Sequence, residues 1–198
     1  MNHEPPARSE ADESELIRRT TAGHDDAARE LVDRHLGALT RFAYRMLGDA
    51  AEAEDVAQET FLRLWRELPS WEPRAKLTTW LHRVAHNLCI DRLRALRRLR
   101  SGDEAEPPDP AAGVAAMLEE HQRAHAIGKA LDALPDRQRA AITLVYHQGL
   151  SNREAAAVLE IEVDALESLL SRGRQNLRRH VKQYAPERRP NERTEPLP

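Results

Sequence analysis

The chain has 198 residues, with 30 Lys and Arg against 33 Asp and Glu, a formal net charge of −3 and only 4% aromatic residues. This length suits one or two small domains, and few aromatic side chains beside abundant Ala and Leu argue against a β-sandwich or barrel. The single cysteine, Cys89, excludes an internal disulfide framework and a multi-cysteine zinc site. The polar start and the lack of a long apolar run predict neither a signal peptide nor a membrane span, so we expect a cytoplasmic protein.

Breaks in the helical pattern divide the chain into two units. Residues 101–113 form an acidic, Pro-rich segment without periodicity, which predicts a flexible linker. The predicted fold class is therefore all-α, with two small helical domains at 13–100 and 114–184 and disordered tails at 1–12 and 185–198. Helices are predicted at 13–22, 26–47, 50–67, 77–100, 114–132, 136–147, 151–159 and 164–182.

The small net charge hides strongly segregated basic segments. Residues 83–100 contain six arginines and one acid, residues 171–186 contain five cations and no acid, and the stretch 101–110 carries four acids. Two basic segments separated by an acidic one can make two separate contacts with phosphate. Arg-rich runs are also typical of solvated helix faces, and charge alone does not decide between the two interpretations.

A pattern typical of a helix-turn-helix lies in the C-terminal unit. Ser151 and Glu154 have the spacing of a capping box, which starts a helix, and a second helix follows residues 160–162. Apolar side chains share one face of that second helix with Gly173, whose small size favours close packing. The opposite face carries side chains suited to base edges and phosphates: Ser168, Ser171, Arg172, Gln175 and Arg179. An ordinary surface helix of a bundle has the same two faces.

The helix predicted at 50–67 has a face that mixes polar and large apolar side chains. Helical projection directs Val56, Ala57, Thr60, Phe61, Leu64 and Leu68 toward a core. The other side has the composition of a protein-binding surface, with Asp55, Gln58, Glu59, Leu62 and Trp65. The alternative is that Leu62 and Trp65 pack beneath another helix or the linker.

The segment 71–98 interleaves aromatic residues with cations and hydroxyls, a composition that suits unstacked single-stranded DNA. A buried stripe is predicted on its helix at Leu81, Val84, Ala85, Leu88, Ala95 and Leu99. Arg83, Asn87, Arg94 and Arg97 project together on the opposite side. The alternatives are core packing for Trp71 and Trp80 and plain solvation for the arginines.

These segments together resemble one family. Residues 55–98, DVAQETFLRLWRELPSWEPRAKLTTWLHRVAHNLCIDRLRALRR, are similar to region 2 of a bacterial sigma factor, and residues 130–179, ALDALPDRQRAAITLVYHQGLSNREAAAVLEIEVDALESLLSRGRQNLRR, are similar to region 4. The chain resembles the extracytoplasmic-function (ECF) group of the sigma-70 family, which keeps only these two regions on a short linker. The resemblance spans roughly 30–100 and 125–182 and rests on two motifs in the correct order.

The resemblance implies an alternative sigma factor without catalysis of its own, which binds core RNA polymerase and directs promoter-specific transcription initiation. Asp55, Gln58, Glu59, Leu62 and Trp65 would dock on the clamp coiled coil of the largest polymerase subunit. Minus-ten promoter contacts would come from Lys76, Thr78, Trp80, Arg83, Asn87, Arg94 and Arg97. Minus-thirty-five contacts would come from Ser168, Ser171, Arg172, Gln175 and Arg179, with region 4 bound to the polymerase flap. An anti-sigma factor, often membrane-tethered in this family, would control the protein, and no cofactor, metal or small-molecule substrate is implied.

Three residues depart from the family's pattern. Glu160 stands in the turn where Gly is common, so it must adopt a positive φ or reshape the turn, at a cost of about 1 kcal/mol. Glu167 and Leu169 stand near the start of the recognition helix, where basic residues are frequent. A glutamate cannot hold phosphate, although it can accept a hydrogen bond from a cytosine amine.

Two other functions are open at this stage. A stand-alone helix-turn-helix regulator would account for the C-terminal unit but not for the segment 50–98, and the sequence lacks an evident dimerisation or ligand-pocket domain. A metal-dependent enzyme or metal sensor is suggested by His82 with His86 and by His121 with His125, each pair at i, i+4, with Cys89 one turn beyond His86. Since the HExxH glutamate is missing and no Gly-rich phosphate loop or convergent acid pair is present, we expect neither a metal nor an enzyme activity.

Overall fold

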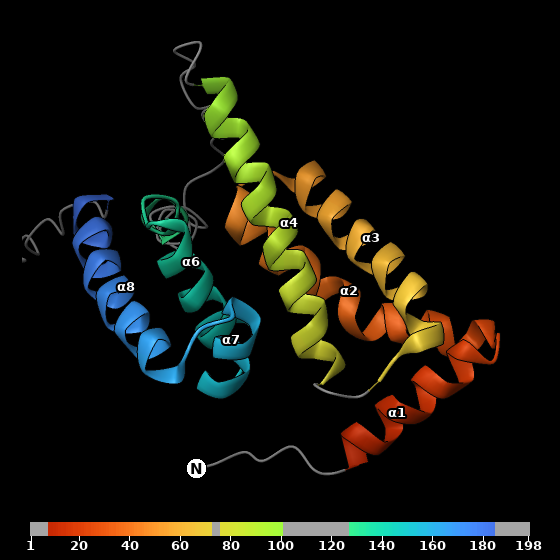
Figure 1. The fold of residues 1–198 in the computed structure, drawn as a ribbon. Coiled ribbons are helices and arrows are strands. Elements are labelled where there is room, and N and C mark those ends of the chain that lie inside the picture. The colour runs from red at the N-terminus through yellow and green to blue at the C-terminus, as the bar shows by residue number, and fades with distance from the viewer. Residues whose placement is uncertain (1–7, 73–75, 101–126, 185–198) are drawn as a thin grey trace, which may run out of the picture.

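The computed structural model describes residues 8–72, 76–100 and 127–184, in which all regular structure is helical (Figure 1). The first unit contains α1 (Arg8–Thr21), α2 (Asp25–Leu47), α3 (Ala50–Glu67), a 3₁₀ turn (Leu68–Ser70) and α4 (Leu77–Arg100). The second contains helical residues 127–132, α6 (Asp136–Ile142), a π-helical turn (Thr143–His147), α7 (Asn152–Leu159) and α8 (Val163–Tyr184). The predicted all-α class is confirmed.

Most helix ends follow from local chemistry that the sequence already carries. Gly48 ends α2 in the left-handed conformation, with φ of 74°, and the Asp49 side chain accepts a hydrogen bond from the Glu52 amide at 3.0 Å at the start of α3. Two predictions differ from the structure. The predicted tail 1–12 is helical from Arg8 onward, and the predicted helix 136–147 changes to a π-helical turn at Thr143. The linker 101–113, residues 114–126 and the tail 185–198 lie outside the described residues.

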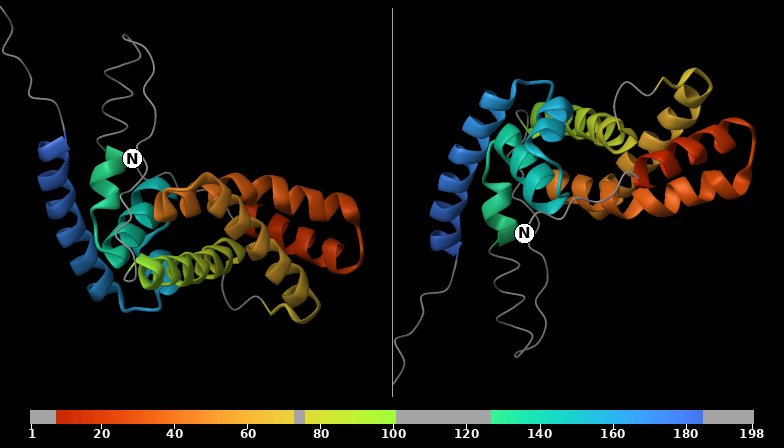
Figure 2. Two further views of the ribbon diagram at one scale, coloured as in Figure 1. Left: turned by 90° about the horizontal axis from the view of Figure 1, so that it is seen from above. Right: turned by 90° about the horizontal axis from the view of Figure 1, so that it is seen from below.

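In the first unit, α2 packs against α1, α3 and α4 (Figure 2). The core of this unit is built from large apolar side chains of α2 and α3 that are almost fully buried, among them Leu31, Leu39, Phe42, Met46 and Leu64. The core-facing residues predicted for α3 are confirmed, since Val56, Ala57, Thr60, Phe61, Leu64 and Leu68 are all buried.

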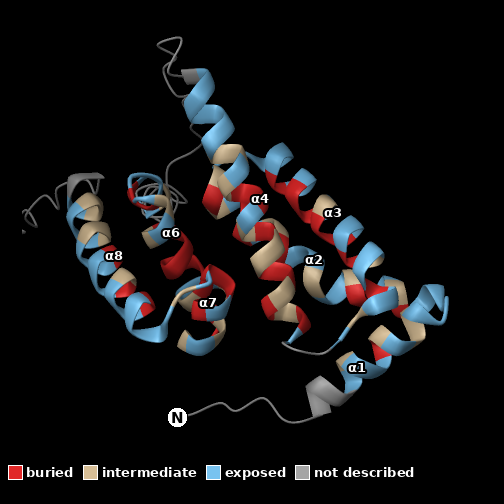
Figure 3. Cartoon of the chain, in the orientation of Figure 1, coloured by how far each residue is buried: buried red, intermediate tan, exposed pale blue. Residues whose placement is uncertain are grey.

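On α4 the predicted buried stripe holds only for the first half of the helix. Leu81, Ala85 and Leu88 are buried, whereas Ala95 is exposed and Leu99 is 74% exposed. Figure 3 shows the reason, because the last turns of α4 extend past the helices that cover its beginning. The apolar spacing of α4 therefore continues in the sequence beyond the point where other helices cover it.

The second unit is built around the packing of α8 on α6. A Cβ atom added at Gly173 would lie 3.0 Å from Ile142 Cγ1, so the two helices approach closely at this position. The prediction that Gly173 permits close packing is confirmed.

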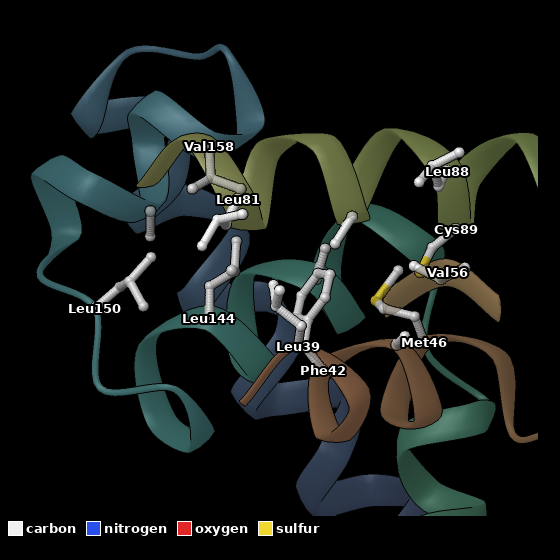
Figure 4. Close-up of a cluster of buried hydrophobic side chains, with 14 of the residues drawn as sticks. Leu39, Phe42, Met46, Val56, Leu81, Leu88, Cys89, Leu144, Leu150 and Val158 are labelled. Atoms are coloured by element: carbon white, nitrogen blue, oxygen red, sulfur yellow. The ribbon is translucent and has the colours of Figure 1, made fainter. Parts of the chain in front are cut away.

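The two units share one continuous hydrophobic core. α4 packs against α7, and the end of α2 contacts α6 and the π-helical turn. Figure 4 shows Leu81 of α4 beside Val158 of α7 and Leu144 of the π-helical turn. α8 lies on the outside of this assembly, with α6 and α7 between it and the first unit (Figure 2).

Candidate protein and nucleic-acid interfaces

The outer face of α3 carries the predicted protein-binding residues. Asp55 and Gln58 are exposed, and Leu62 keeps 48% of its surface in contact with solvent. Glu59 is partly exposed and accepts a hydrogen bond from Arg63 Nε at 2.9 Å, a contact that lowers the pKa of the Glu59 carboxyl. The structure therefore brings these side chains to one accessible face.

Trp65 on the same helix fits both interpretations offered by the sequence. It is half-buried and lies against Phe61, with ring centroids 5.9 Å apart. It also lines a shallow depression between α2 and α3, together with Ala28, Arg29, Val32 and Asp33. The indole supports the core on one side and is reachable from the surface on the other.

An aromatic pair joins Trp71, which follows the 3₁₀ turn, to Trp80 at the start of α4. Trp71 and Trp80 meet edge to face with ring centroids 5.6 Å apart, and both are partly buried against the core. Thr78 is partly buried, and its carbonyl oxygen accepts a hydrogen bond from His82 Nδ1 at 2.8 Å. Core packing of the two tryptophans, the alternative raised for them, is therefore present, although each ring remains partly exposed.

The cations predicted to contact DNA on and before α4 are all paired with carboxylates. Arg94 lies 3.7 Å from Asp91 on its own helix. The other three reach the second unit, with Lys76 3.3 Å from Glu154, Arg83 3.8 Å from Glu160 and Arg97 2.6 Å from Asp136. Asn87 lies on the same side of α4 and is exposed. The three contacts with the second unit could not be predicted from the sequence, because their partners are far apart along the chain.

The outer face of α8 carries the second predicted set. Ser168, Ser171, Arg172, Gln175 and Arg179 are all exposed. The opposite face is covered, since Leu166, Leu170 and Gly173 are buried. α8 thus offers hydroxyl, amide and guanidinium groups on one accessible side, the donor set that reads base edges and phosphates in a major groove.

The helices before α8 have the geometry predicted for a helix-turn-helix. The capping box is complete, because the Glu154 amide donates to Ser151 Oγ at 3.3 Å and the Ser151 amide donates to the Glu154 carboxylate at 2.9 Å. Glu160 ends α7 with φ of 53° and ψ of 48°, so it takes the left-handed conformation and the turn keeps its shape. Glu167 accepts from Asn152 at 3.4 Å, which ties the beginning of α8 to α7.

His82 and Cys89 of α4 lie in the core, whereas His86 is partly exposed. His82 is 3% exposed, and burial lowers the pKa of its imidazole. Cys89 is fully buried, and burial raises the pKa of its thiol to about 12. The described residues contain no group of three or more His, Cys, Asp or Glu side chains arranged to hold a metal ion. His121 and His125 lie outside the described residues.

None of the described helices combines the length and the apolarity that crossing a membrane requires.

Two family models match the chain in the order expected from the sequence. The model described as Sigma-70 region 2 matches residues 31–99, and the model described as Sigma-70, region 4 matches residues 124–177. The first match contains α3 and most of α4, and the second contains α6, α7 and most of α8.

Curated relatives carry the same family name. The chain is 36% identical over 166 residues to the ECF RNA polymerase sigma factor SigE of Mycolicibacterium smegmatis, a match that covers 80% of this chain and 63% of that protein. It is 31% identical over 181 residues to the ECF RNA polymerase sigma factor SigW of Bacillus subtilis, covering 84% of this chain and 95% of that protein. The match therefore spans less than two thirds of SigE but nearly all of SigW.

Solved structures share the fold. CnrH in complex with the cytosolic domain of CnrY aligns with a TM-score of 0.65 and 27% identity, covering 85% of this chain and 96% of that one. The sigma factor RpoE in complex with the anti-sigma factor NepR from Bartonella quintana aligns with a TM-score of 0.61 and 27% identity, covering 78% and 96%.

Proposed function

Because the chain belongs to the extracytoplasmic-function group of the sigma-70 family, we propose that it is an alternative sigma factor that binds core RNA polymerase and directs promoter-specific transcription initiation. Region 2 takes the first helical unit, residues 8–100, because α1 begins at Arg8. The linker takes residues 101–113 and region 4 takes residues 114–184. Acting on RNA polymerase, the protein would work in the bacterial cytoplasm and would have no catalytic activity of its own.

The observation that carries this function is the presence of two different accessible surfaces in one chain. The α3 face joins Leu62 and the edge of Trp65 to polar side chains, as protein-binding surfaces do. The α8 face, by contrast, offers donors and cations and no large apolar group. A stand-alone helix-turn-helix regulator needs the second surface but not the first.

Each surface has an assigned partner. The α3 face docks on the clamp coiled coil of the largest polymerase subunit, and region 4 contacts the polymerase flap while α8 enters the major groove of the minus-thirty-five element. The minus-ten element is contacted from the beginning and the outer side of α4, by Lys76, Thr78, Trp80, Arg83, Asn87, Arg94 and Arg97. Trp80 supplies a partly exposed ring for stacking with an unpaired base.

An anti-sigma factor controls the protein in this proposal. The support is the structural relative RpoE, which is described in complex with the anti-sigma factor NepR. Such a partner would act by covering the α3 face or by holding regions 2 and 4 in an arrangement that polymerase cannot use.

Run-off transcription tests the function directly. Purified bacterial core RNA polymerase is supplied with a pool of genomic promoter fragments, with and without the protein. We expect specific transcripts only when the protein is added, and their start sites give the promoter sequence. Absence of both transcripts and co-migration with core polymerase would contradict the proposal and favour the stand-alone regulator. Co-migration without transcripts would indicate a sigma-like decoy or a missing promoter.

A further inference from the structure

Glu167 lies in the second turn of α8, on the side of the helix that is assigned to the major groove. It stands one turn before Ser171, a residue of that side. The first turns of α8 are largely exposed (Figure 3), and both Glu167 and its neighbour Ser168 are exposed. In a helix-turn-helix, the N-terminal residues of the second helix are the ones that contact base edges. A carboxylate therefore stands where the proposed DNA contact brings α8 nearest to the bases.

The charge of Glu167 is not neutralised within the protein. Asp136, Glu154 and Glu160 of region 4 each pair with a cation on or just before α4. Glu167, by contrast, forms no ion pair within the described part of the chain. The helix dipole favours an acid in the first turn, which accounts for Asp164, but this effect fades beyond that turn. Glu167 thus approaches DNA as an unpaired carboxylate, which the phosphates repel.

Asn152 of α7 orients this carboxylate. Its Nδ2 donates to Glu167 Oε1 at 3.4 Å, across the turn between the two helices. Asn152 is the first residue of α7 and is partly buried, and the capping box of Ser151 fixes the start of that helix. Among the described residues this is the only hydrogen bond to the Glu167 side chain, so Oε2 is available to a second donor.

We propose that Glu167 is a specificity-determining residue that selects cytosine at one position of the minus-thirty-five element, with Asn152 as its positioning residue. The proposal rests on the assignment of α8 to that element. In the major groove cytosine presents an amino donor, guanine presents only acceptors, and thymine presents an acceptor and a methyl group. Adenine has an amino donor but places the N7 acceptor beside it. A carboxylate therefore accepts a hydrogen bond from cytosine and is repelled by an acceptor of every other base.

The carboxylate also acts against incorrect sequences. Where no amino donor is in reach, Glu167 is left without a partner in the groove and close to phosphates, so binding to that sequence is weakened. Discrimination by such a penalty adds to discrimination by the favourable contact. Glu167 therefore lowers the affinity of α8 for DNA in general and raises its preference for one base.

Selection from a promoter library tests the proposal. The library carries a randomised minus-thirty-five element upstream of a minus-ten element taken from the run-off transcripts, and each template has a barcode in its transcribed part. Core polymerase with the full chain transcribes the library, and sequencing of the transcripts gives the base preference at each position. We expect one position at which cytosine is preferred over each other base by about fivefold or more.

Three variants identify the residue behind this preference. E167Q should change it from cytosine to adenine, because a glutamine amide pairs with both the amino group and N7 of adenine. E167A should reduce it to within about twofold of no preference, because the acceptor is lost. The matched control is E162Q, which removes the same charge at an exposed residue just before α8 and should leave every preference unchanged. An equal shift in E162Q would assign the effect to charge and overturn the proposal.

Replacement of Asn152 by Ala tests the positioning role. N152A should lower the cytosine preference of the parent chain and should have no further effect on base preference in E167A, because the amide acts through the carboxylate. A loss of transcription that is equal for all minus-thirty-five sequences would contradict this role.

Two further outcomes separate this inference from the proposed function. Transcripts whose base preferences are the same in the parent, E167Q and E167A would overturn the role of Glu167 and leave the sigma function standing. A preference that depends on Glu167 but favours another base would also overturn it. Absence of transcripts from every template with the parent chain would instead contradict the sigma function on which the inference rests.

Discussion

The Arg97 guanidinium donates to both carboxylate oxygens of Asp136, at 2.6 and 2.7 Å. Asp136 lies in the first turn of α6, where the helix dipole favours a negative charge, so this carboxylate stabilises its own helix and binds α4. The Arg97 side chain is 63% exposed and the Asp136 side chain 15% exposed, so the pair is open to water on the arginine side. Salt therefore screens the pair, and we expect it to contribute about 1 kcal/mol. Arg97 therefore binds Asp136 with a specific geometry but can readily exchange this carboxylate for another anion.

Replacement of Leu62 by Asp should abolish binding to core polymerase. Leu62 is 48% exposed on the α3 face, so the change leaves the core intact and places a charge in the proposed interface. Co-migration with core polymerase on gel filtration measures the loss. L36D, at an exposed position of α2, is the control and should still bind. W65A should also lose binding but is less specific, because Trp65 packs on Phe61. Normal holoenzyme formation by L62D and W65A would rule out the α3 face.

Replacement of Arg172 and Gln175 by Ala should weaken recognition of the minus-thirty-five element by about 1–3 kcal/mol for each lost base contact. Both side chains are exposed on the outer face of α8. R174A is the control, because Arg174 donates to the Tyr146 hydroxyl at 2.9 Å within region 4. The preference for the intact element is measured by competition between promoter fragments with intact and altered minus-thirty-five elements. Unchanged preference in the double variant would mean that another face of α8 reads DNA.

Replacement of Gly173 by Ala should destabilise region 4 by about 1 kcal/mol. The added Cβ would lie 3.0 Å from Ile142 Cγ1, a strain of about 1–3 kcal/mol that the better helix propensity of Ala offsets by about 1 kcal/mol. Urea unfolding of the full chain measures the change. G128A, where no atom lies within 4 Å of the added Cβ, should not destabilise the protein. A G173A chain as stable as G128A would show that α6 and α8 are less closely packed.

Replacement of Glu160 by Gly should stabilise the chain by up to about 1 kcal/mol. Glu160 has φ of 53°, a conformation in which Gly carries no Cβ penalty. E160Q keeps the strained backbone and removes the same charge near Arg83, so a comparison of the two variants isolates the backbone effect. Thermal unfolding measures the effect. Equal unfolding midpoints for E160G and E160Q would contradict the predicted gain in stability.

Acidification should destabilise the protein through His82. Burial lowers the pKa of His82, whereas a histidine in the unfolded chain titrates near pH 6.5. The neutral imidazole's contribution is therefore complete above about pH 6.5 and is lost as the pH falls through the lower folded value. Urea unfolding at about pH 7.5 and about pH 5.5 should show a smaller loss for H82Q than for the parent. A residual dependence is expected from His86 and His147, whose pKa values burial also lowers.

The helix boundaries could be predicted from local chemistry. Gly48 and Asp49 separate α2 from α3, and the Ser151–Glu154 capping box starts α7, because each device acts within a few residues. The predicted faces of α3 and α8 were right for the same reason, since a 3.6-residue period reports which side of a helix is covered. Ala95 and Leu99 on α4 show the limit of that inference. An apolar period does not reveal where the covering helices end.

Contacts between the two regions could not be predicted from the sequence. Arg97 and Asp136 are 39 residues apart, and Arg139 binds a carbonyl oxygen 93 residues away. Pairing between such residues depends on how two helical units pack, which neither charge pattern nor periodicity encodes. The sequence placed Arg83, Arg94 and Arg97 on one side of the helix, but the carboxylates that pair with Arg83 and Arg97 came only from the structure.

Glu154 gives the contact between the regions a property that a purely interfacial residue would lack. Its carboxylate accepts from the Ser151 amide at 2.9 Å and from the Ser151 hydroxyl at 2.7 Å while it pairs with Lys76. When Lys76 departs, both bonds to Ser151 remain, so the first turn of α7 keeps its hydrogen bonds. Loss of the ion pair with Lys76 would therefore cost the contact between the two regions without costing the helix start.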